Sequence, residues 1–162
     1  MLSDGSLTVI AGRPDNGEFS FAFQIAGFMA KKGKRVLLFS LEMDEPGVRK
    51  RMSKQGFEAY ENNVIVYDEP AVSVEYITQK ATGLEKIDAI FVDYIQLMRG
   101  KNNKLISSKQ DVEEIVSSLE HLAEKMNVPI VVVSQLSRNA DGVTEDLRWL
   151  IRSEKQDSAS TT

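Results

Sequence analysis

The chain has 162 residues, of which 42% are hydrophobic and 27% are charged, a composition typical of a soluble globular domain with its own core. Its formal net charge of −4 argues mildly against a dedicated nucleic-acid-binding protein, which usually carries a basic surplus. The absence of cysteine excludes disulfides and cysteine-ligated metal sites, and a single histidine, His121, argues against a His-rich metal site.

Targeting and membrane signals are missing from the sequence. No apolar run approaches the roughly 20 residues that a membrane-spanning helix needs. The N-terminus lacks a basic region followed by an apolar stretch, so it does not resemble a secretory signal. We therefore expect a cytoplasmic protein that makes no membrane contact. We also expect one domain over residues 1–152, followed by a polar, disordered tail over residues 153–162.

Short apolar runs alternate along the chain with segments of helical spacing. These runs are continuous in hydrophobicity, as expected of strands buried on both faces of a parallel sheet. They are Leu7–Ala11, Val36–Leu41, Val64–Tyr67, Ile87–Val92 and Ile130–Val133. Helices are expected between them, over a segment closed by Gly33 and over residues 45–57, 74–84 and 111–126. The alternation predicts the α/β class, with a mostly parallel, doubly wound sheet of about five strands flanked by helices.

Polar residues follow several of the predicted strands. A glycine-containing segment over residues 12–19 follows the first, Glu42 the second, Asp93 the fourth and Gln135 the fifth. In open α/β sheets, ligands bind beyond the carboxyl ends of the strands. We therefore expect these residues to gather at one edge of the sheet.

The segment over residues 12–19 has the frame of a phosphate-binding loop without its chemical groups. It reads GRPDNGEF and matches both glycines of the pattern G-x-x-x-x-G-K-[ST], but Glu18 stands at the lysine position and Phe19 at the hydroxyl position. Two unit charges about 4 Å apart interact by roughly 4 kcal/mol at an effective dielectric near 20. Reversing the charge should therefore weaken binding of a triphosphate by about a thousandfold or more. A structural interpretation also exists, because a glutamate in the first turn favours the helix dipole and Phe19 can pack with neighbouring aromatic residues.

Four segments in order carry a resemblance to a known family. They are residues 11–26 (AGRPDNGEFSFAFQIA), 37–43 (LLFSLEM), 87–98 (IDAIFVDYIQLM) and 128–138 (VPIVVVSQLSR). Together they resemble the RecA-type motor domain of the DnaB-type replicative hexameric DNA helicases, which implies a RecA-like P-loop NTPase core. FSLEM and VDYIQLM in this order are far more specific than the altered loop.

The resemblance implies a role for each matching residue. Glu42 matches the carboxylate that activates the attacking water, Asp93 the acid that holds Mg²⁺ through water, and Gln135 the sensor of the γ-phosphate. Backbone N–H groups of the loop would wrap the triphosphate of ATP. The loop residues are Gly12, Arg13, Pro14, Asp15, Asn16, Gly17, Glu18 and Phe19. With Glu18 and Phe19 in place, we expect ATP and Mg²⁺ to bind weakly or not at all.

The resemblance also implies DNA contacts. Lys101 and Lys104 lie in a polar segment where the family has a DNA-facing loop, and Arg138 follows in the family's SQL-x-R pattern. Read from the residues alone, lysines such as these two most often belong to a solvated loop, Asp93 can be a turn or cap residue, and Gln135 can be a hydrogen-bonded strand end.

Three functions stay open from the sequence. The first is a DNA-replication protein with impaired ATPase activity that binds a replicative helicase, a helicase loader or single-stranded DNA. The second is an active ATP-dependent DNA helicase fragment. The third is a regulatory or ring-capping module with no nucleic-acid role, and a homo-oligomer is compatible with all three.

Overall fold

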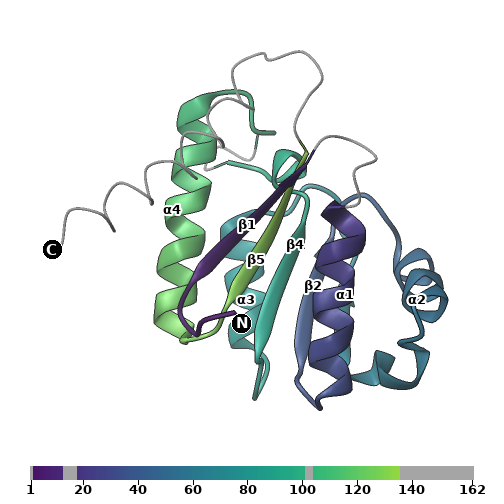
Figure 1. Ribbon diagram of the computed structural model, residues 1–162. Helices are drawn as coiled ribbons and strands as arrows, with labels where there is room; N and C mark the ends of the chain where they lie inside the picture. The colour runs from purple at the N-terminus through teal and green to yellow at the C-terminus, as the bar shows by residue number, and fades with distance from the viewer. Residues whose placement is uncertain (1, 13–17, 101–103, 136–162) are drawn as a thin grey trace, which may run out of the picture.

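The computed structural model describes residues 2–12, 18–100 and 104–135, with only the backbone of Glu18, Phe19 and Lys109. Its centre is a five-stranded, all-parallel sheet in the order β1-β5-β4-β2-β3 (Figure 1). The strands are β1 (Leu7–Gly12), β2 (Val36–Ser40), β3 (Val64–Tyr67), β4 (Ala89–Asp93) and β5 (Ile130–Gln135). The predicted α/β class and the strand count are therefore confirmed.

Helices cover both faces of the sheet. They are α1 (Glu18–Lys31), α2 (Glu45–Lys54), α3 (Val74–Thr82) and α4 (Lys109–Met126), with two short 3₁₀ helices, η1 (Glu58–Asn63) and η2 (Ile95–Leu97). Residues of α1 and α2 pack in one apolar cluster, and residues of α3 and α4 pack in the other. In Figure 1, α1 crosses in front of the sheet while α3 lies behind it.

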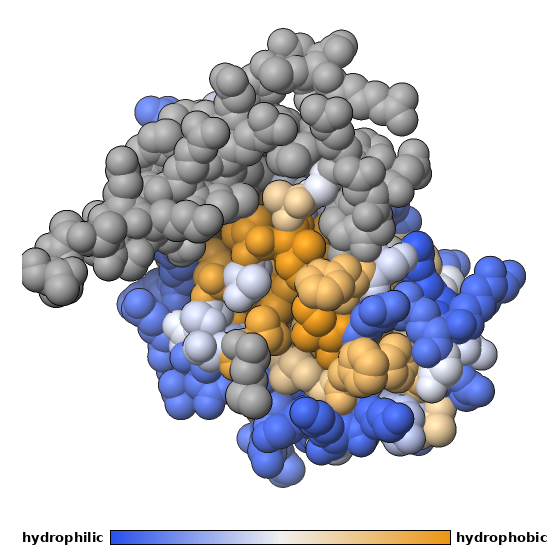
Figure 2. All heavy atoms as spheres, viewed as in Figure 1, coloured by the Kyte–Doolittle hydropathy of each residue, from blue (hydrophilic) through white to orange (hydrophobic). Residues whose placement is uncertain are grey.

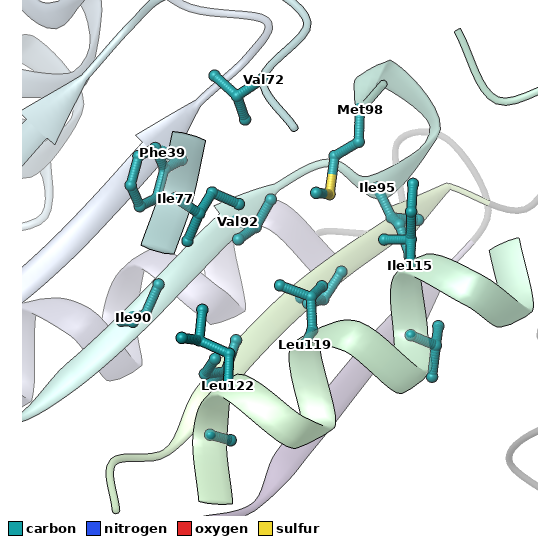
Figure 3. Packing of buried hydrophobic residues seen from close by; sticks show 14 of the residues in the cluster. Phe39, Val72, Ile77, Ile90, Val92, Ile95, Met98, Ile115, Leu119 and Leu122 are labelled. Carbon is teal, nitrogen blue, oxygen red and sulfur yellow. The ribbon is translucent and has the colours of Figure 1, made fainter. Parts of the chain in front are cut away.

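Side chains of β2, β4 and β5 alternate between the two clusters. Phe39 and Ile90 point to the α3–α4 side and Phe91 to the α1–α2 side, each at 2% exposure or less. Leu119 of α4 lies fully buried among the first group (Figure 3). Both faces of these strands are dry, which explains why their sequences are continuous apolar runs.

Helix ends follow local chemistry. Asp44 caps α2 by accepting a hydrogen bond from the Gly47 N–H, and Ser108 caps α4 in a capping box with Asp111. Gly33, at φ +75°, ends α1 as its sequence position predicts. The predicted boundaries were wrong by a few residues elsewhere.

Those boundary differences have local causes. The second helix ends at Lys54 rather than residue 57, because Gly56 takes φ +78° and turns the chain into η1. The fourth strand begins at Ala89 rather than Ile87, because Asp88 instead binds the backbone of Arg35. The expected tail over residues 153–162 lies outside the described residues.

The packing of α1 against η1 depends on a glycine. Gly27 faces the ring of Phe57, and a Cβ added at Gly27 would collide with that ring. Phe57 also meets Phe28 edge-on, with ring centroids 5.3 Å apart. The missing side chain at Gly27 therefore allows the close approach of these two elements.

Candidate functional site

The carboxyl ends of four neighbouring strands meet at one edge of the sheet. In the strand register, Gly12 at the end of β1 lies opposite Gln135 of β5, and Asp93 at the end of β4 lies opposite Ser40 of β2. Glu42 follows two residues after Ser40. The structure thus brings Gly12, Glu42, Asp93 and Gln135 to the edge where the sequence places them.

Asp93 is held in a tight local geometry. Its residue is only 3% exposed, and its carbonyl accepts a hydrogen bond from the Leu41 N–H at 2.7 Å. The peptide bond between Asp93 and Tyr94 is cis. The Ser40 hydroxyl donates to the Met43 carbonyl at 2.6 Å, which turns the chain after β2 and leaves Glu42 exposed. A buried acid and an exposed acid therefore lie on adjacent strand ends.

The pKa of the Tyr94 phenol is affected by burial and by these two carboxylates. Burial raises the pKa of its phenol, and the negative charges of Glu42 and Asp93 raise that pKa further. The phenol therefore stays protonated at neutral pH and retains an O–H donor beside two acids.

Gln96 of η2 joins the end of β4 to the end of β5. Its Nε2 donates to the Ser134 Oγ at 2.9 Å and to the Gln135 carbonyl at 2.8 Å. Its Oε1 accepts from the Gln135 N–H at 3.4 Å. The ladder between the two strands runs only as far as Val92 and Val132. The side-chain amide of Gln96 thus replaces backbone pairing where the strands separate.

Ser40, Tyr94, Gln96 and Ser134 were not predicted as site residues from the sequence. A signal for each was present, because Tyr94 and Gln96 lie within the same VDYIQLM string as Asp93, and both serines end otherwise apolar runs. Ser40 and Ser134 are 1% and 0% exposed, and buried hydroxyls require partners.

The start of α1 departs from the phosphate-binding pattern at two positions, Glu18 and Phe19. The helix begins at Glu18, so a carboxylate belongs to its first turn, and Phe19 follows with no oxygen on its side chain. A helix N-terminus attracts phosphate through its free N–H groups, but an acid in that turn repels it. The lysine and the hydroxyl that the phosphate-binding pattern places at these two positions are therefore absent from the start of α1. Residues 13–17 lie outside the described part of the chain.

The segment after η2 folds back before α4. Arg99 and Leu105 form an antiparallel bridge, and the Gly100 N–H donates to the Lys104 carbonyl at 2.9 Å. Lys104 is exposed, as a contact with a polyanion would require. Lys101 and Arg138, the other two candidate DNA contacts, lie outside the described residues.

Clusters of metal-ligating side chains and membrane-spanning helices are two features that the described ranges lack. Residues 2–12, 18–100 and 104–135 contain no group of three or more His, Cys, Asp or Glu side chains placed to hold a metal ion. Within the same ranges, none of the helices has the length and hydrophobicity needed to cross a bilayer.

Comparison with known proteins gives a consistent result. The family described as the DnaB-like helicase C terminal domain matches residues 2–59 and 50–150 of this chain. A probable replicative DNA helicase of Trieres chinensis is 30% identical over 83% of the chain and 36% of its own length. The replicative DNA helicase DnaB of Geobacillus stearothermophilus is 29% identical, with the same coverage. The chain thus spans about a third of the length of these relatives.

Solved structures share the fold. A DnaB-like replicative helicase, studied with its primase interactions, aligns with a TM-score of 0.73 and 24% identity over 85% of this chain and 41% of its own. A second solved structure, described as an ATPase domain, gives a TM-score of 0.71 and 24% identity over 84% and 59%. A KaiC-like protein from Pyrococcus horikoshii OT3 gives 0.65 and 18% over 88% and 69%. The expected RecA-like fold is thereby confirmed.

Proposed function

The chain belongs to the family of DnaB-like helicase C-terminal domains, and we propose that it takes part in DNA replication without turning over ATP. It acts in the cytoplasm by binding a replicative helicase, the loader of such a helicase, or single-stranded DNA. The relatives named replicative DNA helicases support the link to replication. The proposal concerns this chain alone, which spans about a third of those proteins.

The observation that carries the proposal is the acid that opens α1. Glu18 occupies the first turn of the helix that follows β1, where the phosphate-binding pattern has lysine. A lysine there would attract the β- and γ-phosphates by roughly 4 kcal/mol, and a glutamate repels them by a similar amount. Phe19 adds a second loss, because it offers Mg²⁺ no oxygen ligand.

The other residues at this edge support the proposal through their resemblance to the family's motifs. From the resemblance of the sequence motifs, we propose that Glu42 corresponds to the water-activating base, Asp93 to the magnesium-binding acid and Gln135 to the γ-phosphate sensor. If ATP and Mg²⁺ bound, backbone groups of residues 12–17 would be expected to hold the phosphates. We propose that these residues now serve as a structural frame rather than as a catalytic site.

A charge-reversion experiment tests the loss of ATP binding. Fluorescent ATP is titrated with Mg²⁺ into the whole chain, into the double variant Glu18→Lys with Phe19→Thr, and into Glu58→Lys, a control with the same charge change on exposed η1. The wild type and the control should not bind at micromolar nucleotide, whereas the double variant should recover binding. Micromolar binding by the wild type, or DNA-stimulated ATPase activity abolished by Glu42→Gln, would instead support an active fragment.

A binding experiment tests the partner. Light scattering of the chain mixed with a hexameric replicative helicase, and fluorescence anisotropy with labelled single-stranded DNA, should show binding in at least one case. Lys104→Glu should weaken DNA binding and its salt dependence, whereas Lys125→Glu, exposed at the end of α4, should not. Binding to the helicase ring or to single-stranded DNA supports the proposal, and no binding in either assay or in light scattering with the helicase loader contradicts it.

A further inference from the structure

Two exposed aromatic rings lie on the outer face of α1. Phe21 and Phe28 are each 56% exposed. Seven residues make almost two full turns of a helix, so the two side chains project from the same face, about 10 Å apart along the axis. Gln24 is also exposed and lies between them along that face. α1 thus presents two aromatic rings and one amide on its outer face.

The Phe28 ring is held in place from one side. It meets the buried ring of Phe57 at an interplanar angle of 75°, with the centroids 5.3 Å apart. A side chain that a neighbour already orients loses little further freedom when it binds a partner. More than half of the Phe28 side chain stays exposed in this orientation, so the ring is prepared for a contact that needs a flat apolar surface.

The formal charge of the chain is unevenly distributed. From the start of α1 at residue 18 to the end of α2 at residue 54, there are eight lysines and arginines and four acids. This stretch therefore carries +4, and the other residues carry −8, because the whole chain has a net charge of −4. The acidic total thus conceals a basic layer, and a local basic surface is the electrostatic sign of a nucleic-acid contact.

The cations of this layer lie on the same side of the sheet as the two rings. α1 and α2 cover that side together (Figure 1), and Arg51 of α2 donates to the Ser20 hydroxyl of α1 at 3.4 Å. Figure 2 shows hydrophobic residues gathered in the middle of this side and hydrophilic residues over α2. The exposed lysines of the layer are Lys31, Lys32, Lys50 and Lys54. Aromatic rings and positive charges therefore share one surface.

This combination matches the chemistry of a single nucleic-acid strand. Bases stack on aromatic rings, and lysines neutralise the phosphates that follow the bases along the strand. A duplex keeps the faces of its bases stacked inside, so a single strand fits better. A bilayer fits less well, because the Gln24 amide between the two rings would lose its hydrogen bonds to water in hydrocarbon.

We propose that the outer faces of α1 and α2 form a further contact surface for single-stranded DNA, in which Phe21 and Phe28 stack on bases and the exposed lysines bind phosphates. The choice of DNA as the ligand rests on the proposed function. Lys104, the other candidate DNA contact among the described residues, precedes α4, which packs on the opposite side of the sheet. The two contacts are therefore separate and can be tested independently.

Two variants at one position test the stacking. Phe21→Leu keeps an apolar side chain but has no ring, whereas Phe21→Trp keeps a ring. Binding of the whole chain to a labelled oligo-dT of about 20 nucleotides is measured by fluorescence anisotropy. Phe21→Leu should weaken binding by about fivefold or more, and Phe21→Trp should bind like the wild type. Oligo-dT should also quench the tryptophan fluorescence of Phe21→Trp more than that of the wild type, whose only tryptophan is Trp149.

Two lysine variants test the phosphate contacts. Lys32→Gln removes one charge from the proposed surface, and Lys125→Gln removes one from the exposed end of α4 as the control. The slope of log affinity against log salt concentration should become shallower by about 0.7 in Lys32→Gln, because one fewer counterion is released from the strand. The slope of the control should equal that of the wild type.

Three results would overturn the proposal: equal affinity of Phe21→Leu and Phe21→Trp, an unchanged salt slope in Lys32→Gln, or a wild type that does not bind oligo-dT. Binding to vesicles that contain phosphatidylserine, without binding to oligo-dT, would assign the surface to a membrane instead. If Lys104→Glu alone weakens DNA binding, this surface is excluded while the proposed function stands. The proposed function itself fails only when helicase, loader and single-stranded DNA are all left unbound.

Discussion

Gln96 and Gln135 bind each other as two paired strands would. The Gln96 side chain both donates to the Gln135 carbonyl, at 2.8 Å, and accepts from the Gln135 N–H, at 3.4 Å. A residue of η2 thereby fixes the end of β5, although 39 positions separate the two residues in the chain.

Replacing this amide should be costly. Gln96→Leu keeps a similar volume but leaves the Ser134 hydroxyl and both backbone groups of Gln135 without their partner. We expect a loss of about 1–3 kcal/mol in the free energy of unfolding, measured by urea denaturation, and faster hydrogen exchange at the Gln135 amide. Gln79→Leu on the exposed side of α3 is the control and should change stability little. Equal losses in the two variants would contradict the role of Gln96.

Asp88 should make stability depend on pH. Burial tends to raise the pKa of its carboxyl, but hydrogen bonds from the Arg35 N–H at 2.8 Å and from Lys34 at 3.1 Å hold it below its usual value. A lowered pKa in the folded state means that the contribution is present above the unfolded pKa, near 4, and is lost as pH falls through the folded pKa.

We therefore expect Asp88→Asn to reduce the free energy of unfolding by about 1–2 kcal/mol at pH 7. The difference from the wild type should begin to shrink as the pH falls below about 4, where the carboxyl of the unfolded chain becomes protonated. Urea denaturation across this range provides the measurement. Glu85→Gln, at an exposed position nearby, serves as the control. A difference that stays constant from pH 7 to 3 would rule out this linkage.

The N-terminus of α4 depends on its capping box. The Ser108 Oγ accepts from the Asp111 N–H at 3.2 Å, and the Asp111 carboxylate accepts from the Ser108 N–H at 2.9 Å. Ser108→Ala should cost about 1 kcal/mol of stability in thermal or urea unfolding. Ser117→Ala, at an exposed position inside the same helix, should be neutral or slightly stabilising. If the two alanine variants behave alike, the cap does not contribute.

Two leucines offer a test of the core. Leu119 is fully buried beneath α4, whereas Leu105 is 54% exposed in the segment that precedes this helix. Leu119→Ala should lower the free energy of unfolding by about 2–5 kcal/mol, because it leaves a cavity as well as losing apolar burial. Leu105→Ala should change it far less. Calorimetry or urea denaturation of both variants decides the comparison.

The sequence predicted the strands of the sheet well, and it predicted some of the polar residues at their carboxyl ends. Apolar runs such as Val36–Leu41 and Ile130–Val133 located the strands, because a parallel sheet buried on both faces leaves no other place for them. Glu42, Asp93 and Gln135 were placed at the carboxyl edge by the same topology.

What the sequence could not predict depends on contacts between distant residues. The bond from Gln96 to Ser134 joins segments 38 positions apart, and no local pattern encodes it. The start of β4 was misplaced because Ile87 continues the apolar run, while the neighbouring Asp88 binds Arg35 across the fold. The hydrogen bond from Arg49 to the Val64 carbonyl at the start of β3 is likewise known only from the folded chain.

The contact between Gly27 and Phe57 affects the position of the first turn of α1, although Gly27 lies well inside the helix. An α-helix rises about 1.5 Å per residue, so Glu18 lies roughly 14 Å along the axis from Gly27. Because α1 moves as a rigid body, its distance from the Phe57 ring also determines where its first turn lies relative to the carboxyl ends of the strands. A methyl group at residue 27 would push α1 away from the Phe57 ring and shift the first turn of the helix. Substitutions meant to restore phosphate binding at Glu18 must therefore preserve a steric fit two and a half turns away.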